Sequence, residues 1–285
     1  MMKFLEWLVS WFWKTDDGMD PSPSPNPKPI PVDPRKDFSI TKAAFMFPKQ
    51  PGDGARSDTL VAFSEETNDA QFQRSLDYMK GIKANAYIVV LVNPDQATHK
   101  RTPYRNRWGG EFDQEKLNRW EMRTSKIVGS GMTPIFLMFS SLSKEVAKRQ
   151  AEHERCIVEL IGRFDRYVSM WGVGLEVSEF WTPDEVGDIS KIFKAHTSKP
   201  VGVHSQDVMS GKSPNLSWFA YEFWNPAEGD KRSKEECVAK INAAKAKLGK
   251  SIIAGEYNIN SAGARAREQG QACLNAGAVG AWNGW

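Results

Sequence analysis

Eight short apolar runs recur along the sequence, and amphipathic stretches of helical length separate most of them. Strands that alternate with helices are joined by crossover connections, which place the strands parallel in one sheet. In a chain of 285 residues, eight such units predict an α/β fold of the (β/α)₈ TIM-barrel type. The eight runs are Ala43–Phe47, Ala86–Val92, Thr133–Phe139, Val168–Leu175, Pro200–Val203, Trp218–Phe223, Ser251–Ala254 and Ala278–Trp282.

The stretches between the runs have the apolar periodicity of helices that cover a sheet. Thr182 is a typical N-cap, because Pro183 and two acidic residues follow it in the first turn. Ser205–Ser217 is rich in Ser, Gly and Pro, and we expect a loop there instead of a helix. The expected helices are Asp69–Lys83, Asp113–Gly129, Lys144–Phe164, Thr182–His196, Ser233–Leu248 and Ala262–Ala276.

The N-terminal segment has a different character from the rest of the chain. Residues 1–13 place Lys3, Glu6 and Ser10 at helical spacing, which leaves Phe, Leu and Trp side chains on a wide apolar surface. We interpret residues 1–20 as an apolar N-terminal helix or anchor. Its apolar part, residues 1–13, is too short to span about 30 Å of hydrocarbon, and no cleavage site of a secretory signal follows it. A membrane-surface helix, a protein-docking peptide and packing on the chain's own barrel remain as alternatives.

Residues 21–36 are the predicted linker. Proline stands at nearly every second position from Pro21 to Pro34, which is typical of an extended polyproline II spacer. We therefore divide the chain into an apolar helix or anchor (1–20), a Pro-rich linker (21–36) and a TIM-barrel catalytic domain (37–285). The localisation stays open, and a membrane-surface or phage-associated setting is an expectation from this layout alone.

The charge and the cysteine and histidine content limit the classes of function that the chain can have. The net charge of +3 is the small difference between 38 basic and 35 acidic residues, which argues against a nucleic-acid-binding protein. Three widely spaced cysteines suggest neither a disulfide framework nor a metal knuckle, and we expect them to be reduced and structural. The four histidines lack metal-ligand spacing, so the sequence predicts no metal and no cofactor.

Active sites of TIM barrels lie at the C-terminal ends of the strands, and this rule selects candidate residues directly. Glu176 ends the fourth run, with Glu179 three residues later as an alternative acid, and Glu256 ends the seventh. Alternation places Gly172, Gly174 and Glu176 on one face, and Ile252, Ala254 and Glu256 on one face, so we expect small residues to leave room near each glutamate. The residues expected to contact a ligand at this end are Trp108, Trp181, His204, Tyr221, Trp224, Asn258 and Trp282.

Hydrolysis of a glycosidic bond typically requires two carboxyl groups, and a barrel mouth can bring two together. For a single such glutamate a structural salt bridge is the better explanation, but a pair on the fourth and seventh strands favours function. Burial near Trp171 or Trp181 would raise the pKa of Glu176.

Three short segments carry a resemblance to a known family. Trp-Gly-Val-Gly-Leu-Glu176 resembles the Trp-x-x-x-Asn-Glu motif of the clan of retaining glycoside hydrolases built on (β/α)₈ barrels. Ile-Ala-Gly-Glu256-Tyr resembles that clan's nucleophile strand, and Gly-Ala-Trp282-Asn-Gly-Trp resembles its strand-eight tryptophan, which floors the subsite of the reacting sugar. The chain departs from the motif at Leu175, where the clan has an asparagine that binds the sugar 2-hydroxyl.

The resemblance implies cleavage of a poly- or oligosaccharide by double displacement, with Glu176 as acid/base and Glu256 as nucleophile. The expected partner is therefore a carbohydrate. Leu175 keeps open a second interpretation, a catalytically silent barrel that binds glycans or proteins. A third is a membrane- or assembly-tethered protein that carries the barrel as cargo through residues 1–13.

The basic loop from Lys100 to Trp108 has two interpretations. It is suited to bind an anionic sugar or a phosphate, and it is equally consistent with a solvated loop of incidental charge.

Overall fold

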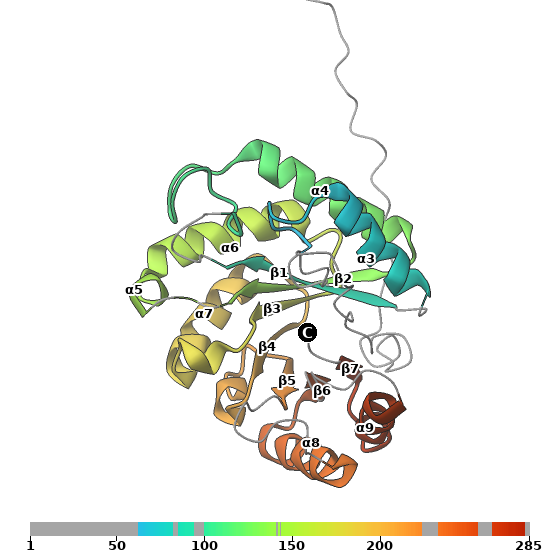
Figure 1. Cartoon of the computed structure of the whole chain (residues 1–285). Coiled ribbons are helices and arrows are strands. Elements are labelled where there is room, and N and C mark those ends of the chain that lie inside the picture. Colours follow the sequence, from blue (N-terminus) through green and yellow to red (C-terminus); the bar gives the residue numbers. More distant parts are fainter. Residues whose placement is uncertain are drawn as a thin grey trace, which may run out of the picture.

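The computed structural model describes residues 62–81, 85–93, 100–140, 142, 144–223, 233–255 and 264–282. Within these ranges, seven parallel strands form one sheet in which each strand pairs with the next along the chain. The sheet curves, with helices outside it (Figure 1). The strands are β1 (Ala86–Val92), β2 (Thr133–Phe139), β3 (Met170–Gly174), β4 (Val201–Ser205), β5 (Trp218–Glu222), β6 (Ser251–Gly255) and β7 (Gly280–Trp282).

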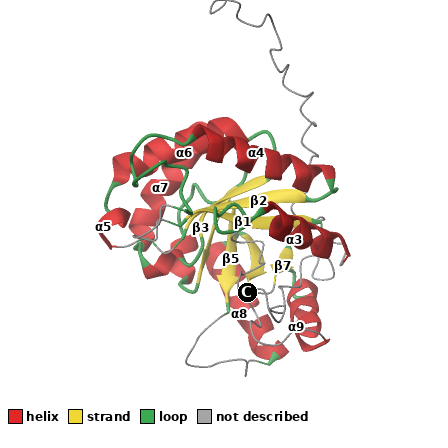
Figure 2. Ribbon diagram, turned by 45° about the horizontal axis from the view of Figure 1, so that its top comes forward, coloured by secondary structure: helices red, strands yellow, loops and turns green. Residues whose placement is uncertain are grey.

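The helices cover the convex side of the sheet (Figure 2). Their positions confirm the expected alternation, with one difference: the stretch expected as a single helix from residue 144 to 164 is divided at Lys148 and Arg149. The helices are α3 (Asp69–Gly81), α4 (Gln114–Gly129), α5 (Lys144–Ala147), α6 (Gln150–Phe164), α7 (Pro183–His196), α8 (Lys234–Leu248) and α9 (Ala264–Asn275).

Local sequence signals fix several of these boundaries. Thr182 caps α7 as predicted: its hydroxyl accepts from the Glu185 N–H, and the Glu185 carboxylate accepts from the Thr182 N–H in return. Ser233 and Glu236 form the same capping box at the start of α8. The segment expected as a loop between β4 and β5 contains only a short 3₁₀ turn, η3 (Val208–Gly211).

The observed strands match the second to eighth predicted runs, and the architecture is a TIM-like α/β fold. The predicted first run, Ala43–Phe47, lies outside the described residues, as do the predicted N-terminal helix (1–20) and linker (21–36). In the described part of the chain, no helix is both long and apolar enough to cross a bilayer.

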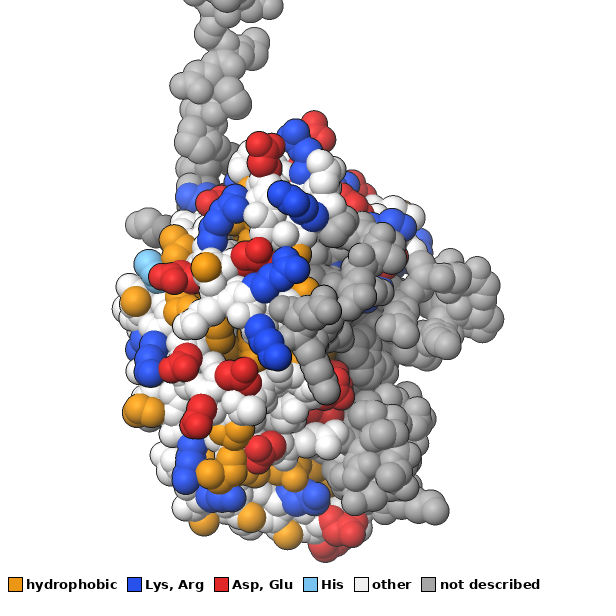
Figure 3. All heavy atoms as spheres, turned by 90° about the vertical axis from the view of Figure 1, so that its left-hand side faces the viewer, with side chains coloured by type: hydrophobic (Ala, Val, Ile, Leu, Met, Phe, Trp, Pro, Cys, Tyr) orange, Lys and Arg blue, Asp and Glu red, His pale blue; other side chains and the backbone are white. Residues whose placement is uncertain are grey.

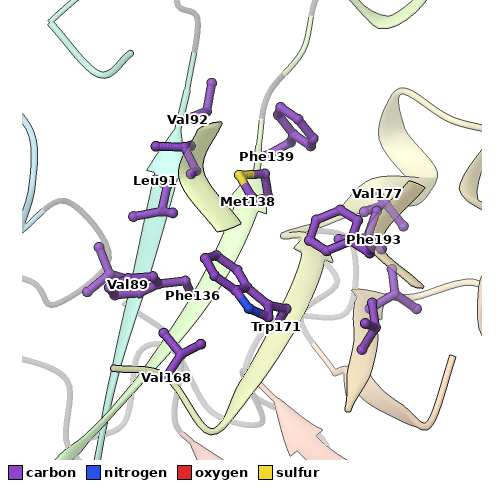
Figure 4. Packing of buried hydrophobic residues seen from close by; sticks show 14 of the residues in the cluster. Val89, Leu91, Val92, Phe136, Met138, Phe139, Val168, Trp171, Val177 and Phe193 are labelled. Atoms are coloured by element: carbon purple, nitrogen blue, oxygen red, sulfur yellow. The ribbon is translucent and has the colours of Figure 1, made fainter. Parts of the chain in front are cut away.

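The sheet has two differently packed faces. Outward-facing strand residues such as Val89, Phe136 and Trp171 pack against the helices (Figure 4). Residues on the concave face form a second, smaller cluster, which we call the inner cluster. Both faces are buried, as expected for a parallel sheet covered by crossover helices. The inner cluster consists of Ala86, Ile88, Ile135, Leu137, Met170, Leu175, Trp218, Ala220 and Ile253.

Candidate active site

Glu176 stands two residues beyond the C-terminal end of β3, at the turn into the 3₁₀ segment η2 (Val177–Glu179). Its backbone adopts the left-handed conformation, with φ 53° and ψ 40°, and among the described residues it is the one non-glycine residue with positive φ. This conformation costs an ordinary side chain roughly 1–2 kcal/mol and concentrates at functional sites. It also breaks the strand alternation that was expected to carry Glu176 onto the face of Gly172.

His204 holds the backbone of Glu176 from the neighbouring strand. The Glu176 N–H donates to Nδ1 of His204, on β4, over 3.2 Å. Because Nδ1 accepts, a neutral His204 carries its proton on Nε2. The His204 side chain is fully buried, and this burial lowers its pKa to about 3. The structure therefore places His204 beneath Glu176 as its backbone partner.

The carboxyl group of Glu176 is half-buried, and its pKa is raised to about 7. Desolvation by burial is the main cause, and the charge of the exposed Glu179 adds to it. Burial, the cause considered from the sequence, thus raises this pKa. A carboxyl group with this pKa is partly protonated at neutral pH and can act as a proton donor.

Two further polar residues lie at the C-terminal ends of β4 and β5, the strands that follow β3 in the sheet. The sheet register aligns Gly172, Gly202 and Trp218 across β3, β4 and β5. Gln206 directly follows the end of β4, and Glu222 is the last residue of β5.

The amide nitrogen of Gln206 donates to the Glu222 carboxylate over 2.7 Å. Glu222 is 2% exposed, whereas Gln206 is exposed. The exposed Gln206 amide can hydrogen-bond a sugar hydroxyl, and the buried Glu222 carboxylate orients that amide. The strand-end rule does not select Gln206, although its position two residues after His204 signals the same face of β4.

The barrel interior below these residues is filled. The Trp218 indole lies so close to Gly172 and Gly202 that a methyl group added to either glycine would come within 3.3 Å and 1.9 Å of its ring, respectively. Leu175 is 2% exposed and belongs to the inner cluster. The expectation that the small residues before Glu176 leave open space is therefore wrong, because Leu137 and Trp218 occupy the space next to Gly172.

Trp108 and Trp181 lie together in a buried aromatic cluster. The ring of His153, on α6, packs 5.5 Å from Trp108 and 5.3 Å from Trp181, and Phe139 at the end of β2 contacts all three. Trp108 is 7% exposed and Trp181 4%, and the Trp181 indole N–H donates to the carbonyl of Ala147. In this arrangement both tryptophans support the loops of the site through packing.

Tyr221 points away from Glu176. Its ring packs on Phe219 and Phe223 in the cluster between sheet and helices, and Nζ of Lys240, on α8, donates to its hydroxyl over 3.4 Å. The structure does not bring Tyr221 together with the residues that surround Glu176.

Four predicted site residues cannot be placed. Glu256, Trp224 and Asn258 lie outside the described residues, and for Trp282 only the backbone of β7 is described. Ile252 and Ala254 pack in the cluster between sheet and helices, and Ile253 belongs to the inner cluster. The face shared by Ile252 and Ala254 is therefore the outer face, which corrects the expectation that these two residues leave room at the mouth.

The described residues contain no group of three or more His, Cys, Asp or Glu side chains arranged to hold a metal ion. The side chains of Cys156, Cys237 and Cys273 are buried, which agrees with the structural role expected for them.

Solved structures with a similar fold include several glycoside hydrolases. A candidate glycoside hydrolase from Bacteroides vulgatus superimposes with a TM-score of 0.58 at 14% identity, covering 90% of this chain and 56% of that one. The chain thus spans little more than half the length of that protein. A family 5 mannosidase from Rhizomucor miehei gives 0.56 at 11% identity, covering 87% and 81%. A family 1 β-glucosidase from Thermotoga maritima gives 0.54 at 10%, covering 91% and 89%.

No protein-family model and no curated protein sequence matches the chain. At 10–14% identity, the likeness to these enzymes shows a shared fold.

Proposed function

We propose that this protein is a glycoside hydrolase that cleaves a poly- or oligosaccharide by retaining double displacement, with Glu176 as acid/base and Glu256 as nucleophile. The observation that carries the proposal is the state of Glu176. It is a half-buried carboxyl at the mouth of a TIM-like barrel, with a pKa of about 7. A carboxylic acid that keeps its proton near neutral pH can donate it to a glycosidic oxygen.

In the first step, a carboxylate oxygen of Glu256 bonds to the anomeric carbon while the glycosidic bond breaks and Glu176 protonates the leaving oxygen. In the second step, Glu176 takes a proton from water, the water oxygen bonds to the anomeric carbon, and the ester to Glu256 breaks. This geometry requires carboxyl groups about 5–5.5 Å apart, whereas about 6.5–9.5 Å is typical of inversion. The left-handed backbone of Glu176, tied to His204, fixes the direction in which its carboxyl leaves the strand.

Aryl glycosides with different leaving groups test the role of Glu176 directly. The structural neighbours include a mannosidase and β-glucosidases, so we choose aryl β-mannosides and β-glucosides with phenol or 2,4-dinitrophenol as the leaving group. Glu176→Gln should lower kcat/KM for the phenyl glycosides at least ~100-fold, and far less for the dinitrophenyl glycosides, which leave without protonation. Glu256→Gln should remove activity on both, and the anomer formed first, observed by NMR, should have the configuration of the substrate.

Glu179→Gln is the matched control, because it removes a neighbouring carboxylate that is exposed. Equal losses in Glu176→Gln for the two leaving groups would contradict the acid/base role. A larger loss for the phenyl glycosides in Glu179→Gln would move that role to Glu179.

Leu175 favours a second candidate function, a glycan-binding barrel without catalytic activity. Its buried apolar side chain cannot hydrogen-bond a sugar hydroxyl at the position where the resembled clan has asparagine. Calorimetric binding of a glycan that the protein leaves uncleaved, with the same affinity in Glu256→Gln, would support this candidate over hydrolysis.

A further inference from the structure

A loop between β1 and α4 forms a hollow against the N-terminal half of α6. The hollow has a volume of about 410 Å³, in the size range of small-ligand sites. We call it the arginine pocket, because three arginines line it and they come from two separate elements. Its lining residues are Arg105, Asn106, Arg107, Gly109, Gly110, Glu111 and Arg155.

The loop that forms the arginine pocket is a closed hairpin. Tyr104 and Phe112 form an antiparallel bridge, and the Arg105 N–H donates to the carbonyl of Glu111 over 3.0 Å. At its tip, Gly109 has φ 72°, and a side chain there would collide with Glu152 of α6. Backbone pairing and this close approach hold the loop against the helix, so the pocket is formed without a ligand.

Arg155, on α6, is oriented by the hairpin. One guanidinium nitrogen donates to the carbonyl of Gly109 over 3.0 Å, and the group lies over the Phe112 ring, 4.8 Å from its centroid. A guanidinium group has five N–H donors in one plane, and stacking fixes that plane. The remaining donors are therefore oriented before any ligand arrives.

The three arginines of the pocket differ from others in the described chain by their lack of a carboxylate partner. Within the described ranges, no carboxylate lies within ion-pair distance of Arg105, Arg107 or Arg155, although Glu111 lines the same hollow. Six other arginines each have a carboxylate within that distance: Arg101, Arg119, Arg123, Arg149, Arg163 and Arg166. The hollow thus holds three guanidinium groups and one carboxylate, which leaves it with a net positive charge.

The arginine pocket lies at the same end of the sheet as Glu176. The hairpin follows the C-terminal end of β1, and Trp108 within it packs on Phe139 at the C-terminal end of β2. Phe139 in turn packs on Trp181, five residues after Glu176. Figure 3 shows this side of the molecule, on which Lys and Arg side chains are interspersed with Asp and Glu side chains.

We propose that the arginine pocket binds the carboxylate of an acidic sugar, and that the glycan recognised by this protein contains uronic-acid units. The inference rests on the proposed function for the nature of the polymer. Planar guanidinium groups bind a carboxylate through paired hydrogen bonds. The small net charge of +3 and the compact pocket favour one acidic sugar unit over a long polyanion such as nucleic acid.

Calorimetry on the full chain tests the proposal with defined probes. The acidic probes are tetrasaccharides of galacturonate, mannuronate and hyaluronan, and the neutral probes are cellotetraose and mannotetraose. At low salt, at least one acidic tetrasaccharide should bind at least tenfold more tightly than either neutral one and than inorganic phosphate. Arg155→Ala and Arg105→Ala should each weaken that binding at least fivefold, and Arg155→Lys should weaken it too, because the planar fork is lost.

Two variants separate recognition from general charge or folding effects. Glu111→Gln removes the negative charge from the pocket and should tighten binding of the acidic probe several-fold, a gain that a purely structural role would not produce. Arg119→Ala removes one partly exposed positive charge outside the pocket and should leave the affinity unchanged. Circular dichroism shows whether each variant is folded. Because Arg105 is exposed, the Arg105→Ala titration tests the pocket without disturbing the packing of Arg155.

The proposal is overturned if no acidic probe binds more tightly than the neutral probes, or if the arginine variants bind the acidic probe as tightly as the unmodified chain does. It is also overturned if phosphate or a single-stranded oligonucleotide binds as tightly as the best acidic probe. The same titrations in Glu176→Gln separate the two proposals. Acidic binding with cleavage intact in that variant would refute the proposed function and leave the pocket in place.

Discussion

At the scale of single residues, Glu176 concentrates the unusual features of the molecule. Its left-handed backbone, its bond to a buried histidine and its raised pKa all result from its position at the end of β3. The raised pKa also affects stability. Between pH 4.5, the ordinary value, and about 7 the folded state retains a proton that the unfolded chain releases. The contribution of Glu176 to the free energy of unfolding is therefore fully present below the ordinary pKa. It falls by on the order of 2–3 kcal/mol as the pH rises to about 7.

Substitution of Glu179 tests the electrostatic part of this effect. Glu179→Gln removes the charge that disfavours ionisation of Glu176, so the pKa of Glu176 should fall but stay above the ordinary range, because burial is the larger cause. The measurement is the titration of the Glu176 carboxyl carbon by NMR, together with the alkaline limb of kcat/KM. Titration of Glu176 in the ordinary carboxyl range in the unmodified chain would contradict the prediction.

At the scale of elements, β3, β4 and β5 are held together by one large side chain. Trp218 on β5 reaches across Gly202 on β4 to Gly172 on β3, because neither glycine has a side chain to exclude it. These three strands also carry Glu176, His204 and the Gln206–Glu222 pair. The packing below the mouth therefore sets the spacing of the candidate site.

A methyl group at Gly202 tests this packing. In Gly202→Ala the new carbon would collide with the Trp218 indole, so we expect a loss of about 1–3 kcal/mol in the free energy of unfolding, measured with urea. Adding Trp218→Leu should cost less in the Gly202→Ala background than in the unmodified chain, because the smaller side chain relieves the collision.

Gly162→Ala, within α6, is the control for a change from glycine to alanine. No atom lies within 4 Å of the added methyl group, so this variant should gain up to about 1 kcal/mol through its better helix propensity. Unchanged stability in Gly202→Ala would show that Trp218 moves aside at little cost.

At the scale of the whole molecule, the described sheet has β1 and β7 as its two edges. Exposed edges of a parallel sheet leave hydrogen-bonding groups unpaired, which a closed barrel avoids. The predicted first run, Ala43–Phe47, would pair with both edges and complete a barrel of eight strands. This closure remains a prediction, since the run lies outside the described residues.

Two truncations test the closure. A chain that starts at Asp37 keeps the predicted strand and should unfold in urea with nearly the midpoint of the full chain. A chain that starts at Gly52 lacks this strand, and we expect a clearly lower midpoint and aggregation through the open edges. Equal stability of the two truncated chains would exclude Ala43–Phe47 as a barrel strand, and a large loss in the first would show that residues 1–36 stabilise the barrel.

The sequence by itself determined the order of strands and helices, the capping of α7, and the placement of Glu176 at a strand end. These follow from local periodicity and capping chemistry, which are written in consecutive residues. Tertiary structure decided which side chains meet. Burial made Trp108 and Trp181 packing residues, and tertiary packing joined Gln206 to Glu222. The arginine pocket likewise depends on Arg155, about 50 residues from the hairpin, because contacts between distant segments arise only when the sheet and its helices pack.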